Sequence, residues 1–170
     1  MTVVYGGAEY PAYVIDPESL REELLDEEEA REWCEETPQD PYAVSFWRML
    51  GELDRALGAG QERLFENEPG SRAWAGAAVR LAQVHHWRGE YADAHELLDA
   101  AATVFEGDAA RTALVLAQRA TVLLDQGRPA EARTPAARAL ALREGSGDPG
   151  LVASSRQVLA RIDRDLRPSA

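Results

Sequence analysis

A six-residue phrase that occurs twice constrains the fold of this chain more than any other feature. Gly89-Glu-Tyr-Ala-Asp-Ala94 is echoed by Gly127-Arg-Pro-Ala-Glu-Ala132, and a helical pattern precedes and follows each copy. A repeat of this size is typical of stacked helical arrays, in which each unit buries its apolar face only against its neighbours. The pattern therefore favours a surface that holds a partner over a reaction centre.

Helix start and stop signals divide most of the chain into antiparallel helices. Ser71, Asp108 and Asp148 precede helical patterns, and serine and aspartate cap the free N–H groups of a first turn. Asp16-Pro17 and Asp40-Pro41 give the same signal, because proline suits the first helical position. Residues 2–15 are expected to form a short hairpin or an extended arm. The predicted helices cover about 16–36, 40–57, 61–67, 71–88, 91–105, 108–126, 128–144 and 148–166.

Two successive units resemble the tetratricopeptide repeat. The family has a fixed order of large residues, a turn glycine and small residues. In the first unit this order falls on Ala78, Leu81, Ala82, His85, Gly89, Ala94, Leu98 and Ala101. In the second unit it falls on Leu116, Arg119, Ala120, Leu123, Gly127, Ala132, Ala136 and Ala139. Trp47-Arg-Met-Leu-Gly51 matches the family's leading phrase and suggests a degenerate earlier unit. The two turn glycines lie 38 residues apart, against 34 in the family, so an extended link near Gly107 is expected.

This resemblance implies an all-α fold of antiparallel helix pairs, stacked as a short TPR-like α-solenoid with capping helices. The expected parts are an acidic N-terminal arm and helix (1–40), a degenerate helical pair acting as a cap (41–70), two repeats (71–106 and 107–144) and a C-terminal capping helix (145–170). Helix axes approach closely only where the side chains between them are small. Burial is therefore expected for Ala82, Ala94, Ala101, Ala120, Ala132 and Ala139.

Net charge limits the classes of partner. The chain carries a formal charge of −12, and the 12 acids and two arginines between Asp16 and Asp40 account for −10 of it. DNA, RNA and anionic membranes are not expected partners, because they require clustered positive charge. The acidic run is interpreted as a solvated helix face. The alternative is a docking surface for a basic partner or for the chain's own arginine-rich end.

Composition also indicates where the protein works. All 18 basic residues are arginine and alanine is abundant, as in proteins from GC-rich bacterial genomes. Met1–Tyr10 lacks the basic start and apolar core of a secretory signal, and no stretch approaches the roughly 20 apolar residues of a membrane span. A cytoplasmic bacterial protein is expected. Cys34 is the sole cysteine and is interpreted as a buried filler, since neighbouring carboxylates disfavour a reactive thiolate.

The resemblance implies a binding site on the concave face, which the first helix of each unit forms. By the alignment, Val79, Gln83 and His86 lie on this face in one unit, and Ala117, Thr121 and Leu124 in the next. Gln157, Arg161 and Arg164 are expected to extend the face, and Trp87 is either a groove anchor or a packing residue. The lysine and asparagine set with which some members hold a peptide carboxylate is missing. An apolar or mixed peptide groove in a protein-binding adaptor is therefore the leading hypothesis.

Two other functions stand beside the adaptor. A homo-oligomer could form through the ends of the array. A metal protein or enzyme could be built on His85, His86 and His95, because imidazole is the commonest neutral metal ligand. His85 and His86 are adjacent on one helix and point about 100° apart, so they do not easily share an ion. The expectation is a non-enzymatic protein without cofactor or metal, which binds a protein or peptide and no membrane.

Overall fold

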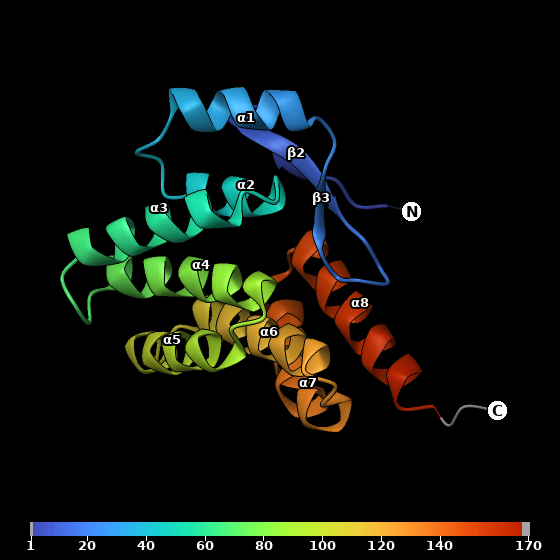
Figure 1. Ribbon diagram of the computed structural model, residues 1–170. Coiled ribbons are helices and arrows are strands. Elements are labelled where there is room, and N and C mark those ends of the chain that lie inside the picture. Colours follow the sequence, from blue (N-terminus) through green and yellow to red (C-terminus); the bar gives the residue numbers. More distant parts are fainter. Residues whose placement is uncertain (1, 168–170) are drawn as a thin grey trace. The chain divides into compact units, whose positions relative to one another are not determined.

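The computed structural model describes residues 2–167, and it is mostly helical, which confirms the predicted all-α class. Three short strands precede the helices: β1 (Tyr5–Gly7), β2 (Tyr10–Ile15) and β3 (Glu22–Leu24). The helices follow in chain order, as Figure 1 shows. They are α1 (Glu27–Glu36), α2 (Ala43–Met49), α3 (Leu53–Glu66), α4 (Arg72–Arg88), α5 (Tyr91–Val104), α6 (Ala109–Asp125), α7 (Pro129–Ser146) and α8 (Pro149–Asp165).

The chain divides into two compact units. The first contains the residues up to Val14 together with Glu22–Val104, and the second contains Ile15–Arg21 together with the residues from Phe105 onward. The short connection between β2 and β3 therefore belongs to the second unit, although the residues on both sides of it belong to the first.

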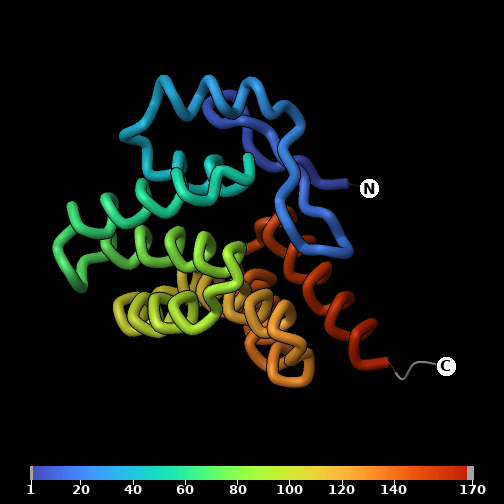
Figure 2. The backbone as a smooth tube through the Cα atoms, viewed as in Figure 1, coloured from blue at the N-terminus to red at the C-terminus, as the bar shows by residue number. Residues whose placement is uncertain are grey.

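Within the first unit, helices that are neighbours in sequence pack on one another. α3 contacts α4, α4 contacts α5, and α2 contacts both α3 and α4. The backbone trace runs back and forth through α3, α4 and α5 (Figure 2). The sheet has the order β1-β2-β3, and Tyr5 of β1 pairs antiparallel with Tyr13 of β2. The core gathers Val44, Phe46 and Leu81, and aromatic residues from the sheet and α1 pack against it.

The structure confirms both predicted helix pairs, α4 with α5 and α6 with α7. Ser71 Oγ accepts the N–H of Trp74 at 3.1 Å, and Asp108 caps α6 in the same way. Gly89 ends α4 with φ of 78°, a left-handed conformation in which glycine meets no steric penalty. The alanines predicted at helix contacts are at most 1% exposed: Ala82, Ala94, Ala101, Ala120, Ala132 and Ala139.

The prediction of a helix over 16–36 was wrong in its first half. The carboxylate of Asp16 does accept the N–H groups of Glu18 and Ser19, as a helix cap would. Leu20 then adopts φ of 59° and ends the turn, and β3 joins the sheet. The helix begins only at Glu27, where Asp26 provides the cap. The hairpin alternative for residues 2–15 is confirmed, because β1 and β2 pair.

The prediction of a helix that starts at Asp40 and ends at Gly58 was also wrong. The chain breaks earlier, at Gly51 with φ of 75°, and α3 then continues through Gly58 and Gly60. Leu50 and Gly51 therefore end a helix, so the Trp47–Gly51 phrase does not open a repeat unit. The helix needs a glycine at position 60 because it lies close to a neighbouring side chain there: a Cβ would lie 2.9 Å from Cδ1 of Leu81.

The second unit is built around α6, α7 and α8. α6 and α8 both pack against α7 and contact each other. The predicted break between helices 128–144 and 148–166 is placed slightly later in the structure, since α7 runs to Ser146 and only Gly147 and Asp148 separate it from α8. Buried residues of all three helices form one apolar cluster: Ala120, Leu123, Leu124, Ala132, Ala136, Val158 and Ile162.

Candidate partner-binding surfaces

The four predicted contact residues of α4 differ in their accessibility. Val79 and His86 are buried, whereas Gln83 and Trp87 are half-buried. The ring of Trp87 also packs against the guanidinium of Arg48, whose Cζ lies 4.5 Å from the ring centroid. Of the four predicted contact residues, Gln83 and Trp87 are therefore the two that stay accessible.

The arginine that packs against Trp87 belongs to a buried ion pair. Arg48 of α2 is 1% exposed and donates to both carboxylate oxygens of Glu22 in β3, at 2.8 and 3.0 Å. Burial raises the pKa of Glu22, but the charge and the hydrogen bonds of Arg48 outweigh it and hold this pKa below its usual value. The pair ties the sheet to α2, and through Trp87 it fixes the end of α4. Nothing in the local sequence pattern indicates this pairing.

On α6, the predicted contact residues lie mainly under the surface. Ala117 and Leu124 are buried, and Thr121 is half-buried. The hydroxyl of Thr121 donates to the carbonyl of Gln118 at 2.8 Å, so its donor is already used. Of the three predicted contact residues on α6, Thr121 is the one that is not buried.

On α8, the predicted contact residues Arg161 and Arg164 face a segment of the same unit. The guanidinium of Arg161 donates to the backbone carbonyl of Glu18 and pairs through Nε with Asp165 at 2.8 Å. Hydrogen bonds from Ser19 lower the pKa of Asp16, and the positive charge of Arg164 lowers it further. The α8 arginines thus lie next to the connection between β2 and β3.

Leu20 provides the apolar contact between this connection and the second unit's helices. Its side chain packs against the cluster that α6, α7 and α8 form in the second unit. The sequence predicted this stretch as helix. An isolated leucine between Asp16-Pro17 and Arg21 does not indicate that its side chain packs against helices far along the chain. We use the name "internal segment" for Asp16–Arg21 below.

The two helix pairs can now be compared with known families. The family model of the tetratricopeptide repeat matches residues 75–145. This stretch of the chain is therefore similar to tetratricopeptide repeats. No curated protein and no solved structure gives a significant match. Tetratricopeptide domains in general mediate protein–protein interactions and are typically not enzymes.

The matched tetratricopeptide residues run from α4 to α7, so α4 with α5 and α6 with α7 are the repeats. α8 lies beyond the match, where a further first helix would stand, and it carries Arg161 and Arg164. Among the described residues, none of the helices is long and apolar enough to cross a membrane.

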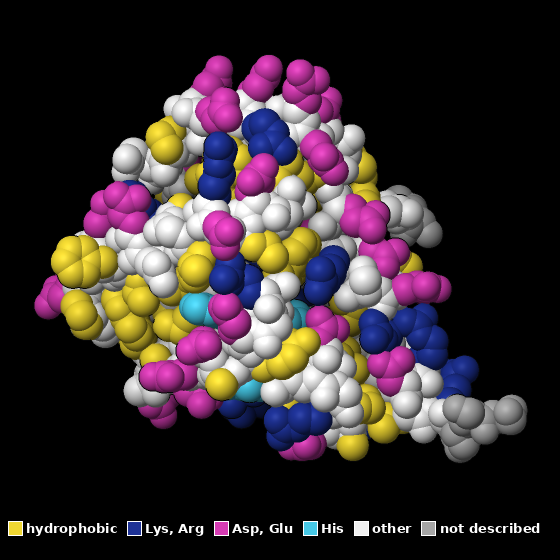
Figure 3. Space-filling model, in the orientation of Figure 1, with side chains coloured by type: hydrophobic (Ala, Val, Ile, Leu, Met, Phe, Trp, Pro, Cys, Tyr) yellow, Lys and Arg dark blue, Asp and Glu magenta, His cyan; other side chains and the backbone are white. Residues whose placement is uncertain are grey.

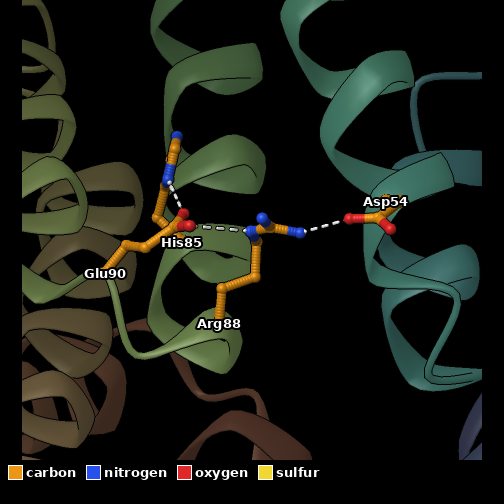
Figure 4. Close-up of polar contacts among 4 residues, drawn as sticks. All are labelled: Asp54, His85, Arg88 and Glu90. Atoms are coloured by element: carbon orange, nitrogen blue, oxygen red, sulfur yellow. Dashed lines mark hydrogen bonds and ion pairs between the residues drawn. The ribbon is translucent and has the colours of Figure 1, made fainter.

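A charged network holds the turn of the first tetratricopeptide repeat (Figure 4). Arg88 at the end of α4 donates to Asp54 of α3 at 2.6 Å and to Glu90 at 2.9 Å. The second carboxylate oxygen of Glu90 lies 2.7 Å from Nδ1 of His85. The hydrogen bond of His85 and then those of Arg88 lower the pKa of Glu90. The network joins α3, α4 and the turn between α4 and α5. Its role is therefore to stabilise the fold.

The histidines do not gather as a three-histidine metal site requires. His86 lies near the ring of Tyr91, with centroids 6.2 Å apart, while His85 faces Glu90. In the described part of the chain, one group has ligand atoms close enough for an ion: His85, Glu90 and Asp93, within 4.8 Å of one another. Because both oxygens of Glu90 are already engaged, one of them by the cationic Arg88, a metal ion would have to displace these contacts.

Proposed function

We propose that this chain is a bacterial cytoplasmic adaptor whose tetratricopeptide helices hold a peptide segment of a partner protein. The observation that carries the proposal is the surface of α8 with the cluster beneath it. That surface already seats a short piece of polypeptide, the internal segment, through a leucine side chain and a backbone carbonyl. A surface with an apolar seat and guanidinium donors suits a mixed apolar and polar peptide.

The predicted contact residues have two different roles in this proposal. Gln83, Trp87, Thr121, Arg161 and Arg164 are accessible enough to touch a partner. The buried ones shape the surface from beneath by fixing where their helices lie. These are Val79, His86, Ala117 and Leu124.

We further propose that the flanking helices act as caps. α2 and α3, within residues 41–70, cover one side of α4, and α8, within 145–170, covers α6 and α7. The acidic residues of α1 line its exposed face (Figure 3). Such a face would favour a partner that carries basic groups, and would speed association at low salt. Nucleic acids and anionic membranes do not fit this charge.

The test is capture of partners from the native lysate with matched variants. Gln83→Ala and Arg164→Ala alter the proposed surfaces, whereas Gln61→Ala on α3 and Arg138→Ala on α7 remove the same side chains from exposed positions elsewhere. The proposal expects a captured protein, identified by mass spectrometry, that the first two variants lose and the last two retain. Equal capture by all four variants would contradict it.

A second candidate function, self-association, is favoured by one exposed side chain. Phe65, near the end of α3, is 91% exposed. Hydrophobic side chains gather on the surface over the end where α3 turns into α4 (Figure 3). Such a patch is typical of an interaction site. Sedimentation equilibrium of the parent and of Phe65→Ser tests this: a parent that is monomeric at all concentrations removes the candidate.

A further inference from the structure

The internal segment has its own hydrogen-bonded shape. The N–H of Leu20 donates to the carbonyl of Asp16, and the N–H of Asp16 donates to the carbonyl of Arg21, both at 2.9 Å. The carboxylate of Asp16 accepts the N–H groups of Glu18 and Ser19 at 3.1 and 2.7 Å. These bonds close one turn within six residues. A preformed turn loses little conformational entropy on binding, so it is well suited to be a ligand.

Leu20 is the anchor of this turn. Its φ of 59° lies in the left-handed region, which leucine adopts at a cost and glycine or asparagine adopts readily. A turn that served only to reverse the chain would be more stable with one of those residues. The leucine is explained by its side chain, which packs against the cluster of α6, α7 and α8.

The polar groups around the anchor complement the turn. Arg161 donates to the carbonyl of Glu18, and the charge of Arg164 acts on Asp16.

We propose that the internal segment is a built-in ligand of the α8 surface, and that a partner protein displaces it with a turn of the same chemistry. That turn has an aspartate cap followed four residues later by a leucine. The donors of Arg161 and Arg164 take its carbonyl and carboxylate groups. This inference rests on the proposed function, since it names the partner chemistry of the same surface.

The experiment uses a labelled peptide with the sequence of residues 15–22 and follows its fluorescence anisotropy with the full chain. Leu20→Asn in the protein removes the apolar anchor but suits the positive φ, so the seat is vacated and the turn is kept. We expect the Leu20→Asn chain to bind the peptide at least tenfold more tightly than the parent, whose own segment competes. A peptide in which asparagine replaces the leucine should not bind to either chain.

Two further variants test the recognition itself. Adding Arg161→Ala to Leu20→Asn should remove most of the gained affinity. Adding Arg156→Ala, which alters an exposed arginine of the same helix paired with Glu144 at 3.1 Å, should leave it intact. Equal peptide affinity of the parent and Leu20→Asn, or equal binding of both peptides, would overturn the inference.

Folding and assembly controls complete the test. If Leu20→Asn does not unfold cooperatively, Leu20→Ala replaces it; if neither variant folds, the segment is a structural part and the inference is wrong. A dimer that the parent forms and Leu20→Asn does not would assign the surface to a second copy, and would also overturn it. If the peptide binds as expected but no partner is captured from the lysate, the inference stands and the proposed function is wrong. If a partner is captured but the peptide does not bind, the inference alone is wrong.

Discussion

At the scale of single residues, close helix contacts decide which small side chains can be replaced. Gly58 and Gly60 lie in the same helix, and both lower its stability relative to alanine. Gly58 has open space around its Cα, whereas a Cβ at Gly60 would lie 2.9 Å from Leu81 and 3.4 Å from Val44. The two glycines therefore form a matched pair for substitution.

Gly58→Ala is expected to stabilise the protein by about 0.5–1 kcal/mol, because alanine has the better helix propensity. Gly60→Ala gains the same propensity but overpacks a buried contact, which costs about 1–3 kcal/mol. The second effect is larger, so Gly60→Ala is expected to be less stable than the parent. Urea unfolding of the three proteins measures both values. A Gly60→Ala protein as stable as Gly58→Ala would show that α3 and α4 are not in close contact.

Cys34 gives a second prediction at this scale. Its side chain is buried, and the pKa of the thiol is raised to about 12, mainly by this burial, while the charge of Arg31 lowers it and that of Glu35 raises it to a smaller extent. The thiol therefore stays protonated at neutral and mildly alkaline pH, as expected for a buried filler. A thiol reagent at pH 8 is expected to leave the folded protein unmodified and to react fully in denaturant. Rapid modification under native conditions would contradict the burial of α1 against α2.

At the scale of elements, the pair of Arg48 and Glu22 joins β3 to α2. Arg48→Met leaves the carboxylate of Glu22 without its partner, and loss of one member of a buried pair costs about 3–5 kcal/mol. The double variant with Glu22→Leu removes both charges and is expected to regain most of this loss. Thermal unfolding of the single and double variants measures the effect. A double variant no more stable than Arg48→Met would mean that the packing of the arginine stem matters more than its charge.

The same pair predicts the direction of a pH effect. The pKa of Glu22 is lower in the folded than in the unfolded state, so the pair contributes stability above the ordinary glutamate pKa of about 4.3. That contribution is lost as the pH falls through the lowered pKa of the folded state. The stability difference between the parent and the double variant should therefore shrink between pH 5 and pH 2, roughly the range of acid titration. A difference independent of pH would assign the stabilisation to packing.

At the scale of the whole molecule, local signals predicted the repeats but were wrong at two places in the first 60 residues, over 16–26 and around Gly51. Ser71, Gly89 and Asp108 act within one turn of their own helices, so their effect is visible in the sequence. Asp16-Pro17 gives the same cap signal, but there the pairing of β3 with the sheet and the distant seat of Leu20 decide the outcome. Such long-range contacts leave no trace in a local pattern.

The candidate site shows the same division. The resemblance placed Gln83, Thr121 and Arg161 on first helices or α8, where the structure has them accessible. It also placed Val79 and Leu124 there, which the structure buries, because periodicity alone does not tell how wide the exposed stripe of a helix is. The packing of Leu20 was missed, although the sequence offered the acidic run as a docking surface for the chain's own arginine-rich end, as the contact of Arg161 with Glu18 has it.

A prediction for the whole chain concerns its shortening. A chain that begins at Ser71 keeps both repeats and α8 but lacks Leu20, so the cluster around Val158 and Ile162 loses its cover. We expect the short chain to bind a fluorescent apolar dye more strongly than the full chain does. Addition of the peptide of residues 15–22 should reduce this binding, and an unchanged signal would mean that the seat had collapsed or never formed.

The position of the internal segment also bears on how such a protein can change over generations. A connection between two strands ordinarily tolerates insertions, because it runs over the surface. Here one added residue before Leu20 would shift the leucine away from the apolar cluster of α6, α7 and α8, and one lost residue would do the same. The length of this connection and the residues of α8 are therefore expected to be inherited together. A recombination that exchanges only the repeats would separate Leu20 from the α6 and α7 residues of the cluster it packs against.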